Sequence, residues 1–391
     1  MITIEEALKI INESITPLGT EVIGYAGSIN RILAEPVYSD MNFPPFNKAT
    51  MDGYACRKID LDQPLTVIEE IPAGKVPVKR INPGQCSKIM TGAEVPERAD
   101  IVIMKEDVKI LGNQKIQFTR KNSAANICFT GEDVKSGDQL LGMGMIIKAE
   151  HLALFAGVGK TEIRVYKKPS IAVISTGSEI VEPDLVPSRG KIRNSNGPQL
   201  VGQVNSMGLN AHYLGIAKDE RDDILHKISL AIDNYDILII SGGVSVGDYD
   251  YVPEILKELG FELLISSIAS KPGKHTIFAR RGNNYALGLP GNPVSSFIQF
   301  EVIGKALIYK LMGHDYKPVK LSVKLSGDFS RGKADRFEII PVRINSSGEA
   351  ELLPYHGSAH IQALAYAEAL MEIPMGIKKI SKGETVYVRP L

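Results

Sequence analysis

The sequence predicts a multidomain α/β plus β protein, and three observations lead to this fold class. The chain has 391 residues, which is too long for one ordinary domain. Between residues 168 and 312, continuous apolar runs alternate with amphipathic helical patterns, as expected of a mostly parallel sheet covered by helices on both faces. On either side, short β-branched runs alternate with Pro and Gly turns and lack a long helical period.

The N-terminal part predicts two helices that flank a β-rich insert. Thr3 and Glu6 have the spacing of a capping box, and apolar residues follow at helical spacing until Pro17. A second helical pattern covers residues 147–156 and ends at Gly157, where glycine permits a left-handed cap. We expect these two helices to pack together across the insert.

The α/β region predicts strands and helices in alternation. Strands are expected at residues 170–175, 211–216, 236–240, 263–268, 276–279 and 285–289, and helices at residues 197–207, 221–234, 251–259 and 294–312. Ligands of such sheets bind beyond the carboxyl ends of the strands. The loops that follow these strands are therefore the first place to look for a site.

After Gly313 the sequence returns to a β pattern. A final β-barrel-like domain of roughly 80 residues lies within the usual size range. The predicted domains are a split helical segment (residues 1–40 and 139–167), a β-rich insert (41–138), the α/β domain (168–312) and a C-terminal β domain (313–391).

The composition indicates a protein that acts on a small molecule. Lys plus Arg and Asp plus Glu each number 45, so no net field attracts nucleic acid or an anionic membrane. Cys56, Cys86 and Cys128 stand far apart without C-x-x-C spacing, which predicts reduced thiols. No apolar run approaches the ~18 residues that span a bilayer, and the first residues do not resemble a signal peptide. We expect a soluble, cytoplasmic protein.

The stretch SGGVSVGDYDYVP after the strand at residues 236–240 has two interpretations. Its G-x-S-x-G spelling is that of a hydrolase nucleophile elbow with Ser245 as nucleophile. An elbow needs a helix directly after the serine, whereas Asp250 as N-cap and Pro253 in the first turn predict a later helix start. Gly242 and Gly243 fit a turn whose amides hold an anion. We favour this anion nest.

Other loops at the carboxyl ends of the predicted strands carry polar groups suited to the same kind of ligand. The loop at residues 175–179 offers hydroxyls and Glu179, and the turn at residues 271–274 carries two lysines. The segments at 193–197 and 289–296 begin helices with free backbone amides. Each loop alone also fits an ordinary polar turn, but together they indicate a phosphate-bearing ligand.

Two acidic residues in these loops are candidate metal ligands. Asp248 and Glu179 fit Mg²⁺ bound between phosphates, since this ion takes one or two carboxylates plus substrate oxygens. In the β-rich insert, the segments at residues 47–55, 89–93 and 131–133 read by themselves as ordinary turns.

Taken in order, these segments resemble a known family. The motifs are MDGYA, MTGA followed by P and AD, GED, STG-x-E, SGGVSVGDYD, KPGK and GLPGNPVS. This series is similar to that of the molybdopterin molybdenumtransferase family, which includes MoeA and the gephyrin E domain. The resemblance extends from the first helix to the C-terminal β domain.

The resemblance implies a homodimer that joins through the split helical segment, with active sites between the α/β domain of one subunit and the insert of the other. It implies a reaction in which adenylylated molybdopterin and molybdate, or tungstate, yield AMP and a metal-bearing dithiolene with the help of Mg²⁺. The molybdopterin adenylyltransferase is a further candidate partner.

Site residues follow from the motifs and from the loops together. The candidate catalytic residues are Asp52, Thr91, Asp133, Glu179 and Asp248, of which Asp248 and Glu179 are also candidate metal ligands. The candidate substrate-binding residues are Ser195, Gly242, Gly243, Ser245, Gly247, Lys271, Lys274, Pro290, Gly291, Asn292 and Pro293.

The chain departs from the family pattern at three places. Ser178 stands where an acid is common, His275 stands where the family commonly has proline, and residues 357–364 replace a serine-rich stretch. Three other functions remain open: a molybdopterin adenylyltransferase-like protein, a non-catalytic scaffold, and a serine hydrolase that uses Ser245. The insert and the C-terminal domain argue against the first of these.

Overall fold

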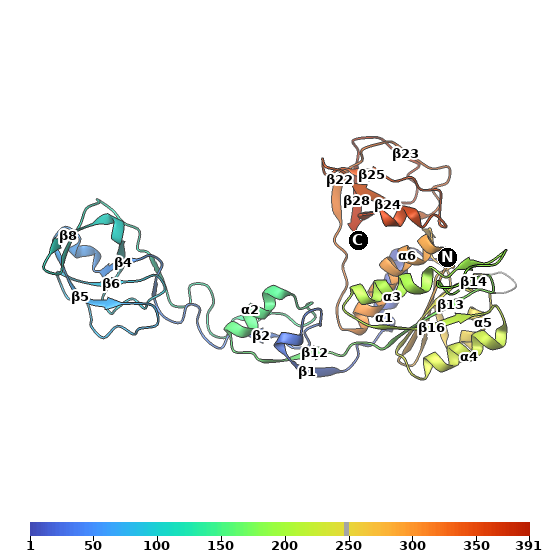
Figure 1. Cartoon of the computed structure of the whole chain (residues 1–391), viewed down its shortest axis with the longest axis horizontal. Helices are drawn as coiled ribbons and strands as arrows, with labels where there is room; N and C mark the ends of the chain where they lie inside the picture. The colour runs from blue at the N-terminus through green and yellow to red at the C-terminus, as the bar shows by residue number, and fades with distance from the viewer. Residues whose placement is uncertain (246–249) are drawn as a thin grey trace. The chain divides into compact units, whose positions relative to one another are not determined.

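The computed structural model describes residues 1–245 and 250–391 (Figure 1). The chain forms two compact units. The first comprises Met1–Ala34, Gly144–Lys148 and Glu162–Leu391, and the second comprises Glu35–Met143 and Ala149–Thr161.

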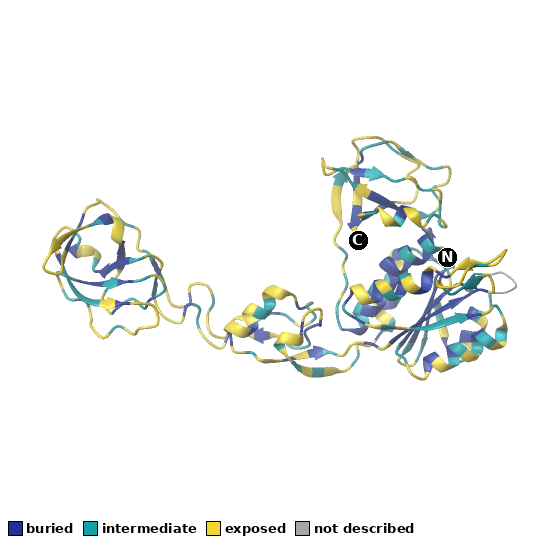
Figure 2. Cartoon of the chain, viewed as in Figure 1, coloured by how far each residue is buried: buried dark blue, intermediate teal, exposed yellow. Residues whose placement is uncertain are grey.

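A six-stranded sheet forms the centre of the α/β domain in the first unit. Its strands are β16 (Ala211–Ala217), β13 (Ile171–Thr176), β17 (Ile237–Ser241), β21 (Asn284–Leu289), β20 (Ile277–Arg281) and β18 (Glu262–Ile265), in this spatial order. The first four strands run parallel, whereas β20 and β18 are antiparallel to their neighbours. β13 and β17 are buried along their whole length, as their continuous apolar sequences predict (Figure 2).

Helices cover both faces of this sheet, and each face has its own apolar core. The helices are α3 (Asn196–Ser206), α4 (Arg221–Ile232), α5 (Val252–Glu258), α6 (Pro293–Gln299) and α7 (Lys305–Leu311). α4 and α5 pack on one face, and α3, α6 and α7 pack on the other. The short strands β14 (Ile180–Val181) and β15 (Ile192–Arg193) form a separate parallel pair in the same domain.

The N-terminal helix α1 (Ile4–Ser14) also belongs to the α/β core. Its capping box is confirmed: the Thr3 hydroxyl accepts from the Glu6 amide at 3.1 Å, and the Glu6 carboxylate accepts from the Thr3 amide at 2.8 Å. The apolar face of α1 is buried with α7 and β18. The expected packing of α1 with the later helix involves two different units and stays a prediction, while the buried face of α1 packs within the first unit.

The helix expected at residues 294–312 is not one regular α-helix. α6 continues into a π-helical segment at Phe300–Gly304 and then into α7. Glu301 of the π-helical segment is buried, where it pairs with Lys305 and accepts from Gln203 of α3 at 2.8 Å. A buried carboxylate needs such partners. The irregular segment thus ties α3 to the helix that follows β21.

The C-terminal domain is a second six-stranded sheet. Its path is β19 (Ser270–Lys271), β24 (Phe337–Ile344), β26 (Ala369–Ile373), β28 (Thr385–Pro390) and β22 (Leu321–Lys324), with β25 (Ala350–Leu352) paired to β24. β23 (Phe329–Ser330) pairs with β27 (Lys379–Ile380), and a short helix α8 covers Gln362–Ala365. β19 comes from the α/β domain and pairs in parallel with β24. The two domains of this unit are therefore joined through a shared sheet.

A small antiparallel sheet completes the first unit. It consists of β1 (Thr20–Gly24) and β12 (Glu162–Tyr166).

The second unit is built around a six-stranded sheet of short strands. The order is β7 (Ile101–Met104), β4 (Gly53–Cys56), β6 (Gln85–Ile89), β5 (Leu65–Ile71), β9 (Lys115–Phe118) and β8 (Val108–Gly112). The remaining elements are β2 (Val37–Tyr38), β3 (Lys48–Ala49), β10 (Ile127–Cys128), β11 (Gln139–Leu141) and helix α2 (Ala149–Gly157). Apolar side chains fill both faces of the sheet.

The cysteines of this unit are free thiols. Cys56 and Cys86 face each other across β4 and β6, and both are fully buried. Burial raises the pKa of the Cys86 thiol to about 12. A thiol in such surroundings stays protonated and unreactive. Within the described residues, no helix has the length and apolar character needed to cross a membrane.

The C-terminal sheet contains a buried charge cluster, from which a prediction about the stability of the protein follows. Glu372 accepts from Arg389 at 2.8 Å and from Lys320 at 2.5 Å, and Glu372 and Arg389 are both buried. Glu372→Gln should lower the free energy of unfolding by about 3 kcal/mol, because it leaves a buried guanidinium without its counter-charge. Urea denaturation followed by circular dichroism measures this loss.

The matched control is Glu351→Gln, which removes the ion pair with Arg343 at the solvent-exposed side of the same sheet. Its cost should stay below about 1 kcal/mol. Equal losses from the two substitutions would contradict the assignment of the buried cluster.

Candidate functional site

Two adjoining cavities lie at the carboxyl ends of the parallel strands of the α/β domain. The first, which we call the glycine cavity, has a volume of about 750 Å³ and is lined by the loops that follow β13, β17 and β21 and by the start of α3. The second, the basic cavity, has a volume of about 900 Å³ and lies between the turn after β19 and the C-terminal sheet. These positions match the expected location of ligands in such sheets.

The Gly242–Gly243 turn forms one wall of the glycine cavity. Both residues have positive φ, at 96° and 64°. A Cβ on Gly242 would lie 2.5 Å from the carbonyl oxygen of Thr176, so no other residue fits there. The Gly242 amide donates to the Leu289 carbonyl at 3.0 Å. This amide is therefore not available to an anion, which corrects part of the anion-nest prediction.

The next described residues of the predicted nest are Gly243 and Ser245. Within the described chain, the Gly243 amide has no hydrogen-bond acceptor, and Ser245 is half-buried at the cavity wall. Gly247 and Asp248 lie outside the described residues. Any anion contact from the described part of this loop therefore begins at Gly243.

The position of Ser245 does not fit a nucleophile elbow. α5 begins only at Val252, well beyond the serine, and its N-cap position is occupied by Tyr251 rather than by the predicted Asp250. Within the described part of the chain, no hydrogen bond connects Ser245 to a histidine. An activated serine requires both features.

Two buried asparagines at the start of α3 hold the loops of the glycine cavity together. Asn196 donates from its side chain to the Ser241 hydroxyl and to the Gly291 carbonyl, both at 2.7 Å. Asn194 accepts from the Ser175 hydroxyl at 3.1 Å. The sequence prediction named Ser195 between them, which is exposed at the N-cap position without a capping bond. A buried amide that reaches two distant loops has no local sequence signal.

Glu179 is the candidate metal ligand that the structure describes. It lies at the edge of the glycine cavity with an exposed carboxylate folded over Gly177. Asp219 and Asp250 line the same cavity, and Asp219 accepts from the Ser178 amide at 2.7 Å. Among the described residues, no group of three metal-ligating side chains gathers at one point. A Mg²⁺ ion that takes most of its ligands from phosphates and water does not require such a group, so Glu179 fits this ion.

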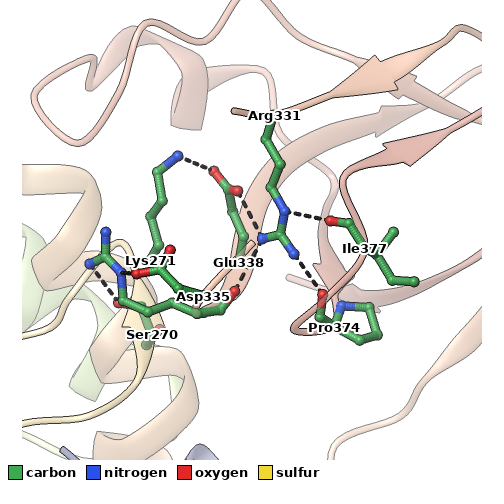
Figure 3. A network of polar contacts seen from close by, with 8 residues as sticks. Ser270, Lys271, Arg331, Asp335, Glu338, Pro374 and Ile377 are labelled. Atoms are coloured by element: carbon green, nitrogen blue, oxygen red, sulfur yellow. Dashed lines mark hydrogen bonds and ion pairs between the residues drawn. The ribbon is translucent and has the colours of Figure 1, made fainter. Parts of the chain in front are cut away.

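The two lysines of the turn after β19 differ in their partners. Lys271 pairs with Glu338 at 2.8 Å, and the other oxygen of this buried carboxylate accepts from Arg331 at 3.0 Å (Figure 3). Arg331 is held in turn by the Pro374 and Ile377 carbonyls. Lys274 is exposed in the basic cavity and has no ion pair within the described residues. Lys274 is thus the lysine with a free charge.

A buried glutamine of α6 fixes this turn. The Gln299 side chain donates to the Ser270 hydroxyl at 3.0 Å and to the Pro272 carbonyl at 2.9 Å. The Thr276 hydroxyl donates to the Gly273 carbonyl at 2.9 Å. The backbone on both sides of Gly273 is therefore held in place by hydrogen bonds from the protein interior.

The start of α6 also differs from the prediction. Pro293 occupies the first turn and Asn292 the N-cap position, as expected, but the Asn292 side chain makes no capping bond. It donates to the Ser358 hydroxyl at 3.0 Å, and the Val294 amide donates to the Ser358 carbonyl at 3.0 Å. A segment of the C-terminal domain thus takes the amide that we expected to be free for phosphate.

In the second unit, the structure brings Asp52 and Thr91 together. The Asp52 carboxylate accepts from the Thr91 amide and hydroxyl, both at 2.8 Å, and from Lys105 at 3.3 Å. These donors lower the pKa of Asp52 to about 2. A carboxylate with this pKa is a weak base that stays ionised near neutral pH. Sequence reasoning missed Lys105.

Asp133 lies on another loop of the second unit, between β10 and β11. It is exposed, and its amide donates to the Phe43 carbonyl at 3.0 Å. The hydrogen bond to Phe43 holds the backbone of Asp133, and its side chain is exposed to solvent.

The fold and its cavities define a class of protein: an α/β domain with two adjoining cavities at its strand ends, joined to β domains. Three family models match successive parts of the chain. They are described as the MoeA N-terminal region (domain I and II) at residues 2–159, a "Probable molybdopterin binding domain" at 172–310, and the MoeA C-terminal region (domain IV) at 323–391.

Individual relatives agree with these matches over the full length. A molybdopterin molybdenumtransferase of Staphylococcus aureus is 33% identical over 398 residues, which cover 99% of this chain and 95% of that protein. The Staphylococcus epidermidis protein of the same name is 33% identical over 400 residues. The crystal structure of a molybdopterin biosynthesis MoeA protein from Pyrococcus horikoshii OT3 has a TM-score of 0.86 at 30% identity and covers 100% of both chains. The chain belongs to the molybdopterin molybdenumtransferase (MoeA) family.

The hydrogen bonds to Asp52 give a pH prediction for the second unit. Because its pKa is lowered to about 2, the carboxylate should stay ionised throughout the range from pH 4 to pH 9. The double variant Thr91→Val, Lys105→Gln removes two donors, so the pKa should rise towards the ordinary value of an aspartate. Carboxyl ¹³C NMR titration measures it. Lys109→Gln on the edge strand β8 is the control, and an unchanged pKa in the double variant would refute the assignment.

The Gly242 turn gives a second prediction. Gly242→Ala should cost roughly 1–3 kcal/mol of stability, because alanine meets both the positive φ and the Thr176 carbonyl. Gly202→Ala in the exposed middle of α3 has open space around the new methyl group and should stabilise the protein by about 0.5–1 kcal/mol. Denaturant midpoints compare the two, and a Gly242→Ala protein as stable as the wild type would show that the turn is not constrained.

Proposed function

We propose that this protein is a molybdopterin molybdenumtransferase of molybdenum cofactor biosynthesis. In the proposed reaction, adenylylated molybdopterin and molybdate bind together, AMP is released, and molybdenum remains on the dithiolene of the pterin. The observation that carries the proposal is the pair of adjoining cavities in a chain that matches this family over its whole length. One cavity offers glycine-rich strand ends to a phosphate-bearing ligand, and the other offers free positive charge to an oxyanion.

The charges of the basic cavity suit a dianion such as molybdate or tungstate. Among the described residues, its charged lining consists of one carboxylate, that of Glu338, and four basic side chains: Lys271, Lys274, Arg331 and Arg336. The Glu338 carboxylate forms ion pairs with Lys271 and Arg331. It therefore does not neutralise Lys274, whose positive charge is available to a ligand. Charge attraction in a partly enclosed site is stronger than in bulk water, and a lysine binds an oxyanion as a point charge.

We assign the glycine cavity to the phosphate end of the adenylylated substrate. Gly243 and Ser245 offer donors at the end of β17, and Ser195 offers a hydroxyl at the start of α3. Pro290, Gly291, Asn292 and Pro293 close the cavity from the loop after β21. Mg²⁺ held by Glu179, with Asp248 as second ligand, would supply charge neutralisation for the phosphates.

The carboxylates of the second unit belong to the same proposal. Asp52, positioned by Thr91, supplies a permanently ionised group, and Asp133 supplies an exposed one. We further propose that the protein acts as a homodimer and receives its substrate from a molybdopterin adenylyltransferase.

The decisive test incubates the full-length protein with adenylylated molybdopterin, Mg²⁺ and molybdate, and follows AMP release by chromatography. We expect AMP release that depends on molybdate. Absence of AMP with both molybdate and tungstate would exclude the transferase function and leave the scaffold function.

Ser245→Ala should retain most of the AMP-release activity, because the serine is not a nucleophile in this proposal. Loss of all activity, together with labelling by a serine-directed probe, would favour a hydrolase instead.

Lys274→Ala should lower kcat/KM for AMP release by about tenfold to hundredfold, because it removes the free charge of the basic cavity. The matched control is Lys257→Ala at the exposed end of α5, which should change kcat/KM by less than about twofold. If both substitutions had the same small effect, the basic cavity would not be the oxyanion site.

A further inference from the structure

The two cavities share a wall, and the residues in this wall define the passage between them. Three residues line both cavities: His275, Pro290 and Asn292. Transfer of an atom from a ligand in one cavity to a ligand in the other has to take place next to this wall. The chemistry of these three side chains therefore bears directly on the proposed transfer.

Of the three, His275 is the residue whose side-chain hydrogen-bonding groups are all unpaired within the described residues, whereas Asn292 already uses one N–H on Ser358. Proline has no side-chain donor. The Asn292 amide donates to Ser358 at 3.0 Å. Within the described residues, neither ring nitrogen of His275 has a hydrogen-bond partner, although the residue is half-buried. A half-buried imidazole with both nitrogens open toward a polar cavity is suited to a ligand.

The surroundings keep this imidazole fixed and neutral. His275 directly follows the turn that Gln299 holds, and Thr276 behind it is fully buried and bonded to Gly273. The charged groups that face it are Lys274 on its own turn, Asp250 before α5, and Arg336 before β24. Burial and the charge of Lys274 lower the pKa of His275. Near pH 7 the ring therefore donates from one nitrogen and accepts at the other without adding charge.

We propose that His275 positions the oxyanion at the junction of the basic cavity and the glycine cavity by donating a hydrogen bond to one of its oxygens. This inference rests on the proposed function, of which it names a further binding residue. Lys274 attracts the dianion, and His275 orients it toward the glycine cavity.

Direct binding of molybdate tests the inference independently of turnover. Isothermal titration of the full-length protein with sodium molybdate should give a Kd about tenfold weaker for His275→Ala than for the wild type, because one hydrogen bond to a charged ligand is lost. His275→Asn places an amide donor near the position of Nδ1, and His275→Gln places one near Nε2. At least one of them should bind within about threefold of the wild type.

His212→Asn is the matched control. His212 lines a separate cavity beside Tyr235, so its substitution should leave molybdate binding unchanged. Circular dichroism of all variants checks that the fold is retained. A His275→Ala protein with wild-type affinity, a wild type that does not bind molybdate, or failure of both amide variants to restore binding would each overturn the proposal.

Kinetics separate positioning from a purely structural role. In the AMP-release assay, His275→Ala should raise KM for molybdate about tenfold and leave KM for the adenylylated pterin within about twofold. Equal changes in both KM values would indicate a general disturbance and would overturn the assignment. If the wild type binds molybdate through His275 but releases no AMP, the inference on His275 holds and the proposed reaction fails.

Discussion

The turn that lines the basic cavity and reaches the glycine cavity through His275 depends on one buried side chain, the amide of Gln299. This residue lies on α6, behind the turn that carries Lys271, Lys274 and His275, and it donates to the turn at two points. A buried amide must find such partners, since an unpaired polar group in the interior is costly. The Nε2 group of the amide and the two acceptors of the turn satisfy each other, whereas Oε1 of Gln299 has no partner among the described residues. The result is a turn whose backbone is held in place before any ligand arrives, which lowers the backbone entropy lost on binding.

The same turn connects the α/β domain to the C-terminal sheet. Ser270 and Lys271 form β19, which pairs with β24, so Lys271 comes into register with Glu338. Because Glu338 is buried, it requires positive partners, and it takes Lys271 and Arg331. Lys274 lies beyond the end of this pairing and has no ion pair among the residues that the structure describes. The division into a structural lysine and a ligand-binding lysine therefore follows from where the shared strand ends.

Sequence patterns were sufficient where the physical cause is local. The capping box of α1 involves residues one turn apart, and the continuous apolar runs of β13 and β17 report burial on both faces directly. The later helix start after Ser245 was also predictable, although the N-cap proved to be Tyr251. The family resemblance came from the order of turns and is confirmed by the full-length relatives.

The errors concern interactions between residues far apart in the sequence. The Gly242 amide donates to the Leu289 carbonyl because β17 pairs with β21. The Val294 amide in the first turn of α6 donates to the Ser358 carbonyl of the C-terminal domain. No local pattern reveals that Glu338 neutralises one lysine of the pair, or that Lys105 lowers the pKa of Asp52. The irregular helix after α6 carries a buried carboxylate that pairs across to α3, a contact with no local sequence signal. Each of these is set by tertiary packing, which overrides local preference.

The central claim is that the Gln299-held turn presents Lys274, and not Lys271, to the oxyanion. A crystal of the full-length protein soaked in tungstate tests it most directly, because the anomalous scattering of tungsten locates the ion. The account predicts a tungsten peak in the basic cavity with an oxygen within hydrogen-bonding distance of Lys274, while the Lys271–Glu338 pair stays intact. A peak bound by Lys271 with Glu338 displaced, or one outside the basic cavity, would contradict it.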